Sequence, residues 1–190
     1  NGKVNIFEYN GTNWSQIGQD IIGDSFLGTG SSVAINGTGD KIVVGSKNAN
    51  YHNNLGSGWV SVYHYDGSFW NQLGQNINYE PMIFDEQGEM EFGYSVDINL
   101  LGDVISSGTW TPFVNGVKYG GVVKNYELNG NNWVKKGPNV YGVDGLCSFG
   151  SSVALNGSGN IFVSSDLGNA LSNEGINQTR VLSSPPSYCP

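Results

Sequence analysis

The acidic side chains best suited to chemistry are concentrated in one short segment. Asp85, Glu86, Glu89 and Glu91 follow an apolar stretch there. Clustered carboxylates can hold a hard cation such as Ca²⁺, but apolar residues beside acids also suit a loop that docks a protein partner, and a plain solvated loop has the same composition. We expect a docking loop and no metal site. Its candidate contact residues are Tyr79, Met82, Ile83, Phe84, Asp85 and Glu86.

The remaining residue types that do chemistry stand alone. His52 and His64 are the two histidines, and neither lies in a cluster, whereas a general base or metal site needs a companion group. The sequence has no Gly-x-Ser-x-Gly elbow, and its glycine-rich turns are not followed by the Lys-Ser/Thr of a phosphate loop. We therefore predict no catalytic residue, no cofactor and no enzymatic activity.

The tryptophans divide into two groups. Trp14, Trp70 and Trp133 recur at the same offset in three similar segments, which favours packing between neighbouring structural units over carbohydrate stacking. Trp59 and Trp110 do not recur, so we expect them to belong to an exposed partner-binding or glycan-binding surface.

Cysteines and glycosylation sequons favour an extracellular setting. Cys147 and Cys189 are the two cysteines, their spacing is not that of a metal site, and a disulfide between them would tie the tail to the third segment. Asn-x-Ser/Thr sequons, which are candidate glycosylation sites, occur at Asn10, Asn13, Asn36, Asn156 and Asn177.

Charge excludes two classes of partner. The chain of 190 residues has a formal net charge of −8 and no basic patch, so it would repel a nucleic-acid backbone and an anionic membrane surface. No apolar run reaches the roughly 18 residues of a membrane-spanning helix. The chain starts at Asn1, from which we expect a processed chain or an excerpt of a longer one.

The same sequence motif occurs three times along the chain. Gly-x-Val-x-x-(Phe/Tyr)-x-x-x-Gly-x-x-Trp opens at Gly2, Gly58 and Gly121, and Gly-x-Ser-Val follows around Val33, Val96 and Val153. Such self-similarity indicates tandem copies of one supersecondary unit. The predicted organisation is repeat 1 at 1–57, repeat 2 at 58–120 with an inserted loop at 78–90, repeat 3 at 121–166, and an irregular tail at 167–190.

Each copy is predicted to supply four short strands. Alternating apolar and polar residues, joined by Asn-Gly or Asp-Gly turns, are typical of half-buried antiparallel strands. The expected strands A to D span 4–9, 14–18, 32–35 and 42–45 in the first copy, 60–65, 70–74, 95–98 and 104–108 in the second, and 122–128, 133–137, 152–155 and 161–164 in the third. Residues 180–182 suggest the remnant strand of a fourth unit. The fold class is all-β, a β-propeller-type array of three four-stranded antiparallel blades, either partial or part of a larger propeller.

The motifs resemble the FG-GAP-like repeats of integrin-type β-propellers, which are found in surface proteins of marine bacteria, microalgae and their large viruses. The resemblance rests on residues 11–21 and 67–77 and on Phe-Gly-x-Ser-Val at Phe92 and Phe149, and it extends over residues 2 to 166. Thr29-Gly30 departs from the Phe-Gly of the other copies. No segment has the alternating Asp/Asn residues ending in Gly that form the calcium loop of that family, so we do not expect a calcium site here.

The predicted function is that of a non-enzymatic structural and adhesion module, extracellular or on a cell or particle surface. It would bind a protein partner, or itself, through loops on a rigid scaffold. The alternatives are a lectin-like carbohydrate-binding propeller and a virus capsid-accessory or surface protein. A hydrolase ranks last, because it would need two facing carboxylates.

Overall fold

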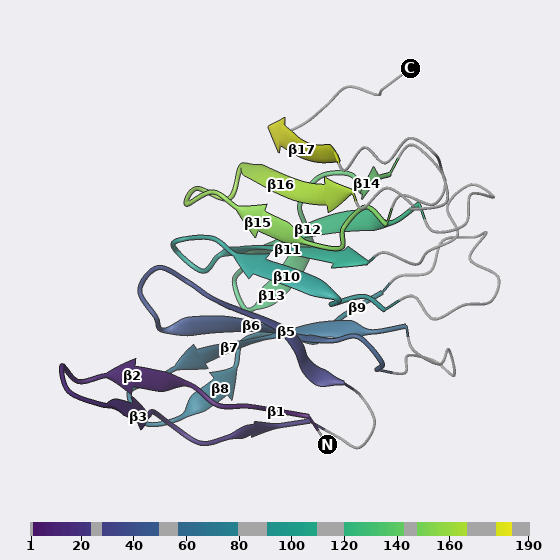
Figure 1. Cartoon of the computed structure of the whole chain (residues 1–190). Helices are drawn as coiled ribbons and strands as arrows, with labels where there is room; N and C mark the ends of the chain where they lie inside the picture. Colours follow the sequence, from purple (N-terminus) through teal and green to yellow (C-terminus); the bar gives the residue numbers. More distant parts are fainter. Residues whose placement is uncertain are drawn as a thin grey trace.

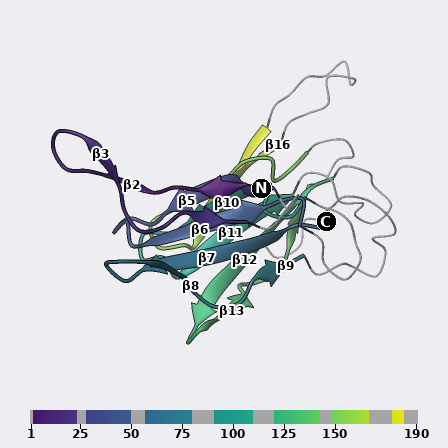
Figure 2. The same cartoon turned by 90° about the horizontal axis from the view of Figure 1, so that it is seen from below.

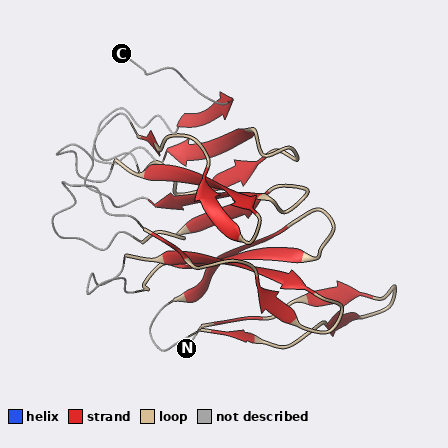
Figure 3. Cartoon of the chain, turned by 180° about the vertical axis from the view of Figure 1, so that it is seen from behind, coloured by secondary structure: helices blue, strands red, loops and turns tan. Residues whose placement is uncertain are grey.

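The protein is built from β-strands. The computed structural model describes residues 2–23, 28–49, 57–79, 91–109, 120–142, 148–166 and 178–183. Its secondary structure there consists of strands and contains no helix, so the prediction of an all-β fold is confirmed (Figure 3). The described residues accordingly contain no helix suited to crossing a membrane.

The strands form four successive layers along the chain (Figure 1). Layer 1 consists of two short antiparallel pairs. In one pair β1 (Lys3–Val4) lies against β4 (Ile21–Ile22), and in the other β2 (Phe7–Tyr9) lies against β3 (Trp14–Gln16).

Layers 2 and 3 share one topology. Layer 2 has the order β5-β6-β7-β8, and β9 also pairs with β7. Layer 3 has the order β10-β11-β12-β13, and β14 also pairs with β12. The layer 2 strands are β5 (Thr29–Ile35), β6 (Lys41–Ser46), β7 (Trp59–Tyr65), β8 (Trp70–Gln72) and β9 (Ile77–Asn78). The layer 3 strands are β10 (Ser95–Ile98), β11 (Val104–Thr109), β12 (Val122–Asn129), β13 (Asn132–Lys135) and β14 (Val140–Tyr141).

Layer 4 is the last described layer along the chain. It has the order β15-β16-β17, with β15 (Val153–Leu155), β16 (Ile161–Asp166) and β17 (Gln178–Ser183), all antiparallel. The predicted remnant strand at 180–182 is therefore present as part of β17, within the segment expected to be an irregular tail.

The layers do not coincide with the sequence copies. Strands C and D of one copy lie in the same sheet as strands A and B of the next. Strand D pairs with strand A there, as Ser46 of β6 does with Trp59 of β7. The copy boundaries at 57/58 and 120/121 therefore lie inside layers 2 and 3. The first copy's strands A and B make up layer 1, and the third copy's strands C and D begin layer 4.

An asparagine fixes the turn between strands C and D in every copy. The Asn36 side-chain oxygen accepts a hydrogen bond from the Lys41 backbone N–H at 2.9 Å, and its amide donates to Asp40 at 2.8 Å. Asn99 and Asn156 make the corresponding backbone contacts. An asparagine side chain can bond its own neighbouring backbone in this way, so the recurring Asn serves the turn.

The Gly-x-Ser-Val motif joins neighbouring layers. Gly93 has a φ of 86°, and its carbonyl accepts a 2.7 Å hydrogen bond from the Ser32 hydroxyl of the preceding layer. Gly150 accepts the same bond, also 2.7 Å long, from Ser95. A positive φ favours glycine, which explains why glycine recurs at this position.

The apolar core lies between the layers. Between layers 2 and 3 it contains Val43, Val60, Val62, Phe92, Val96, Ile98, Ile105 and Trp133. Smaller clusters lie between layers 1 and 2 and between layers 3 and 4. One face of each layer thus packs on the next, which makes the gap between two layers the repeating feature in which a site can form.

The recurring tryptophans confirm the packing interpretation in two copies only. Trp70 and Trp133 are 2% and 3% exposed between adjacent layers. Trp14, in contrast, is 68% exposed, so the expectation of burial is wrong for this residue. No described strand lies beyond layer 1 to cover it.

Candidate functional site

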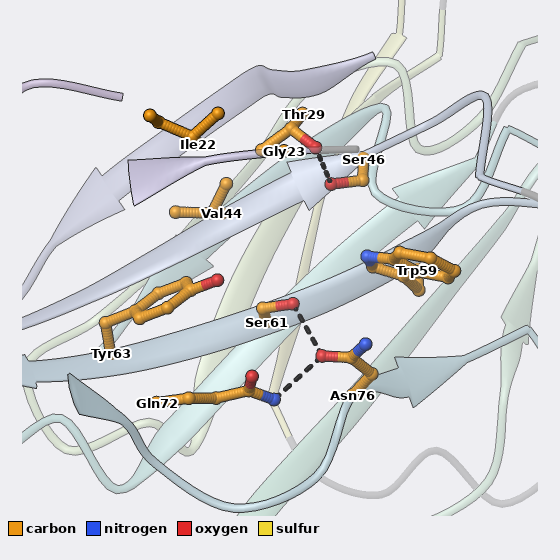
Figure 4. Close-up of a pocket in the computed structure, with 10 residues that line it drawn as sticks. All are labelled: Ile22, Gly23, Thr29, Val44, Ser46, Trp59, Ser61, Tyr63, Gln72 and Asn76. Atoms are coloured by element: carbon orange, nitrogen blue, oxygen red, sulfur yellow. Dashed lines mark hydrogen bonds between the residues drawn. The ribbon is translucent and has the colours of Figure 1, made fainter. Parts of the chain in front are cut away.

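A polar pocket lies in the gap between layers 1 and 2. It has a volume of about 170 Å³ and opens to solvent (Figure 4). The lining residues are Ile22, Gly23, Thr29, Val44, Ser46, Trp59, Ser61, Tyr63, Gln72 and Asn76. Strand β7 supplies Trp59, Ser61 and Tyr63 because alternate residues of a strand point to the same face.

Asn76 is the centre of the pocket's hydrogen-bond network. Its side-chain oxygen accepts a 2.9 Å bond from the Ser61 hydroxyl and a 2.8 Å bond from the Gln72 amide. Figure 4 places the amide nitrogen of Asn76 on the side facing Trp59. Two donors therefore fix the amide so that its own N–H groups point toward the aromatic side of the pocket.

Tyr63 supplies a second donor. Burial raises the pKa of its phenol, and a hydrogen bond with Ser61 offsets part of that rise. The hydroxyl stays protonated across the neutral range. Because the single Ser61 proton goes to Asn76, the Tyr63 hydroxyl donates the bond that it shares with Ser61, and it can donate to a ligand oxygen that replaces this contact.

The pocket exists because two side chains are small in the first copy. Thr29 and Gly23 stand where the second copy has Phe92 and Tyr79, as the alignment on Gly30 and Gly93 and on strands β4 and β9 shows. Phe92 and Tyr79 are buried in the gap between layers 2 and 3, with ring centroids 6.1 Å apart. The same space between layers 1 and 2 has no aromatic ring from these two positions.

The side chain of Lys124 helps to fill the gap between layers 2 and 3. This residue occupies the place of Ser61, and its ammonium nitrogen lies 3.9 Å from the centre of the Tyr79 ring and 5.8 Å from that of Phe92. The arrangement is a buried cation–π contact. Equivalent positions thus form a packed core in one gap and an open polar pocket in the other.

The described pocket suits a neutral ligand rich in hydroxyl groups. Its polar lining consists of hydroxyls and carboxamides, and the described part contains no carboxylate, imidazole or thiol. Amides and hydroxyls both donate and accept, as a polyol requires, and an aromatic side chain can lie against an apolar ring face. Within the described ranges, no three His, Cys, Asp or Glu residues are grouped to hold a metal ion.

Few of the sequence-predicted contact residues lie where the structure describes them. Trp59 lines the pocket and is half-buried. Tyr79 is buried in the core between layers 2 and 3, so its side chain is not available to a partner. Met82, Ile83, Phe84, Asp85, Glu86, Glu89 and Trp110 fall outside the described residues.

The remaining predicted features lie away from the pocket. His64 faces Asp40 at 3.7 Å near the turn between strands C and D, and Glu91 pairs with Lys47 at 3.5 Å. Asn36 is buried and its amide is used inside the turn, which makes it a poor glycan acceptor, whereas Asn10 and Asn13 are exposed. Outside the described residues lie Cys147, Cys189, Asn177 and His52.

Sequence reasoning missed the pocket, although one signal pointed to it. The signal is Thr29, which stands in the first copy where the other two copies have the core residues Phe92 and Phe149. A missing large residue in one copy of a packed repeat is the sequence signature of a cavity.

Known proteins match this chain by fold and not by sequence. Neither a family model nor a curated protein sequence matches it. The solved structure of a periplasmic gluconolactonase from Pseudomonas aeruginosa matches with a TM-score of 0.50 and 14% identity, covering 86% of this chain and 43% of that one. A putative 6-phosphogluconolactonase from Bacteroides uniformis matches with a TM-score of 0.35 and 9% identity, covering 92% and 65%.

The first of these likenesses corrects the functional prediction. The chain was expected to be a non-enzymatic adhesion module, with lectin-like and virus-particle versions, and to have no activity. The protein whose fold it shares is an enzyme by its description, which overturns that expectation. The chain spans less than half of the length of that structure.

Proposed function

We propose that the chain is part of an enzyme with a β-propeller fold that acts on a sugar lactone, and that the pocket between layers 1 and 2 binds the sugar. The observation that carries the proposal is the polar pocket, in a chain that shares its fold with a periplasmic gluconolactonase. The four layers would be blades or parts of blades, and closed propellers have four to eight of them. A location outside the cytoplasm, such as the periplasm, accords with the same neighbour.

The pocket residues suit the polyol part of such a substrate. Ser61, Asn76 and Gln72 offer hydroxyl and carboxamide groups at one wall, and Trp59 offers an aromatic face at another. A binding site of this kind fixes orientation with a few placed polar groups and gains affinity from the apolar surface beside them.

The reaction would be ester hydrolysis. Water adds to the lactone carbonyl carbon, the ring C–O bond breaks, and a hydroxy acid forms that releases one proton at neutral pH. The Tyr63 hydroxyl and the Asn76 amide are donors that can face the carbonyl oxygen, where negative charge develops. The ten lining residues include no base to activate the water, so the proposal assigns them binding and polarisation.

The test compares the chain with a variant whose pocket is filled. Thr29→Phe introduces the residue type that the other copies have at this position, Phe92 and Phe149. The variant should fold, because the third copy has the same combination of a glycine at the first position, Gly142, and a phenylalanine at the second, Phe149. Thr29→Ser is the matched control, because it keeps the hydroxyl and adds no bulk to the pocket. Proton release from gluconolactone is followed in a pH-stat against spontaneous hydrolysis, and binding of the non-hydrolysable lactam analogue is measured by calorimetry.

We expect the chain and Thr29→Ser to bind the lactam and accelerate proton release, and Thr29→Phe to lose at least about tenfold in both. Absence of lactam binding and of turnover by the intact chain would refute the function. Equal activity in Thr29→Phe would instead show that the pocket is not the site.

A further inference from the structure

One tryptophan contact occurs twice inside the chain. The Trp70 indole N–H donates to the Ile17 carbonyl at 3.1 Å, and that of Trp133 donates to the Leu73 carbonyl at 2.9 Å. The glycine after each acceptor has no side chain to obstruct the ring. A Cβ on Gly18 would lie 2.6 Å from the Trp70 ring, and one on Gly74 would lie 2.9 Å from the Trp133 ring.

A glutamine completes each copy of this contact. The Gln19 side chain accepts from the Trp70 backbone N–H at 3.0 Å and donates to its carbonyl at 2.8 Å. Gln75 makes the same two bonds to Trp133, at 3.1 and 2.8 Å. The tryptophan of one layer thus docks on the end of strand B in the preceding layer.

Within the described residues, one half of this contact is unmatched in layer 1 and the other half is unmatched in layer 3. Trp14 is the tryptophan of layer 1, and it is exposed on the β2–β3 hairpin, which extends away from the other layers (Figure 2). Gly137 is the corresponding glycine of layer 3, with a φ of 73° and no atom of the described residues within 4 Å of the position of a Cβ. It follows Lys136, the counterpart of Ile17 and Leu73.

A second pair of surfaces is unmatched in the same sense. Val33 and Ile35 of β5 are 54% and 52% exposed, whereas Val96 and Ile98 at the same positions of β10 are 8% and 5% exposed. Strand β10 is covered by β5 of the preceding layer, and β15 in turn packs on β10. No described strand covers the face of β5 that carries Val33 and Ile35. Strand β15 of another copy could cover it, because β15 is equivalent to β5 and β10 in the repeat.

We propose that a second copy of this chain docks head to tail on the surface formed by Trp14, Val33 and Ile35. Trp14 of one copy would lie on Gly137 of the other, and the β15–β16 hairpin of that copy would cover Val33 and Ile35. Both halves of a contact that the chain already makes twice are present on the chain itself, so a second copy is the partner that it matches.

Docking completes layers 1 and 4 together. The β2 strand of one copy would pair with β16 of the other, as β7 pairs with β6 and β12 with β11. Strand β17 holds that edge of β16 in the single chain and gives it up on docking. When the contact forms at both junctions, two copies contain six complete layers, within the range of four to eight blades that close into a ring.

The third acceptor differs from the other two in one respect. Pro138 stands where Gln19 and Gln75 make two bonds to the tryptophan backbone. The contact between copies therefore lacks these bonds, and we expect it to be weaker than the internal contacts and to depend on protein concentration.

The test is the oligomeric state of the chain, measured by light scattering and mass photometry over a range of concentrations. We expect a species of twice the 20.3 kDa chain mass at high concentration. Trp14→Ala should weaken it by about 30-fold or more, as for a buried tryptophan at an interface. Gly137→Asn should act likewise, because asparagine tolerates the positive φ and places a Cβ under the incoming ring. Phe69→Ala, at another exposed aromatic residue, should leave it unchanged.

A chain ending at residue 177 tests the strand exchange separately. Without β17 the edge of β16 is open, so association should become tighter, and a weaker or unchanged dimer would refute the exchange. A chain that is monomeric at every concentration, or a dimer that Trp14→Ala does not weaken, would overturn the proposal as a whole. Lactam binding by a monomeric chain would leave the proposed function intact.

Discussion

The ring of Trp133 lies so close to Gly74 that a Cβ on the glycine would be only 2.9 Å from it. This indole is 3% exposed and donates to the Leu73 carbonyl, so it joins layers 2 and 3 by packing and by a hydrogen bond. Trp14 has the same sequence environment, but no described layer precedes it. The difference between the losses in free energy of unfolding caused by Trp133→Ala and Trp14→Ala therefore measures how much the packing between layers contributes.

Trp133→Ala should lower the free energy of unfolding by about 3–5 kcal/mol, because it removes a large core side chain. Trp14→Ala should change it by less than about 0.5 kcal/mol in the monomer, as an exposed substitution does. Urea unfolding at low protein concentration measures both. Similar losses for the two variants would mean that Trp14 is buried in solution.

The close approach of layers at glycine gives a second prediction. A Cβ on Gly108 would collide with the Gly150 carbonyl of the next layer, so Gly108→Ala should destabilise the fold by about 1–3 kcal/mol. Gly157 does not have a positive φ, and its nearest neighbour, Leu100, is 3.5 Å from the Cβ position. Gly157→Ala is therefore the control, expected to be neutral or slightly stabilising. Thermal unfolding of the two variants would contradict this account if Gly108→Ala proved the more stable.

Acid should weaken the turn between strands C and D of the first copy. Hydrogen bonds from Thr38 and then Asn36 lower the pKa of Asp40 below its usual value of 3.8. A carboxyl group with a lowered folded-state pKa stabilises the protein above its unfolded pKa, and that contribution is lost as the pH falls through the folded value. The contribution of Asp40 is thus constant near neutrality and declines only below the ordinary pKa of an aspartate.

Asp40→Asn tests this assignment, because it introduces the residue type that the third copy has at the equivalent position. Asn160 takes the same place in the third copy, where its side-chain oxygen accepts a 2.8 Å bond from Asn156. The variant should keep the turn and reduce the loss of stability in acid. We would measure thermal unfolding from pH 7 to pH 3, and an unchanged acid dependence would show that other carboxyl groups dominate it.

The pocket network gives a prediction about binding. Asn76→Leu removes the acceptor of the Ser61 and Gln72 bonds together with the amide that faces the pocket, so it should weaken lactam binding by about tenfold. Asn139 occupies the equivalent position in layer 3, and its buried side-chain oxygen is without a hydrogen-bond partner in the described structure. Asn139→Leu should leave binding unchanged, and calorimetry on both variants would refute the assignment if they behaved alike.

The sequence was sufficient to predict strands and turns, because these depend on local chemistry. Alternation predicted β7 and β12 almost to the residue, and the asparagine before each C–D turn was visible as a recurring letter. The two-residue strands β4, β9 and β14 were not predicted, since two residues cannot display a period.

The offset between copies and layers could not be predicted in the same way. A repeat fixes the period of a chain but not which strands pair, and the pairing of Ser46 with Trp59 across a copy boundary is a tertiary fact. The pocket was missed for a related reason. It is created by the small size of Gly23 and Thr29, and the cavity left by a small residue is apparent only when the rings of Tyr79 and Phe92 are seen filling the same place.

The offset between sequence copies and layers affects how cooperatively the chain unfolds and how it can gain a further copy. A cut at the boundary between two copies separates strands that are hydrogen-bonded to each other, so no copy can leave with an intact sheet. Neighbouring units must then unfold together, which makes the array more cooperative than separately folded beads would be. Insertion of one further copy at such a boundary, in contrast, would add one complete sheet and expose no new edge.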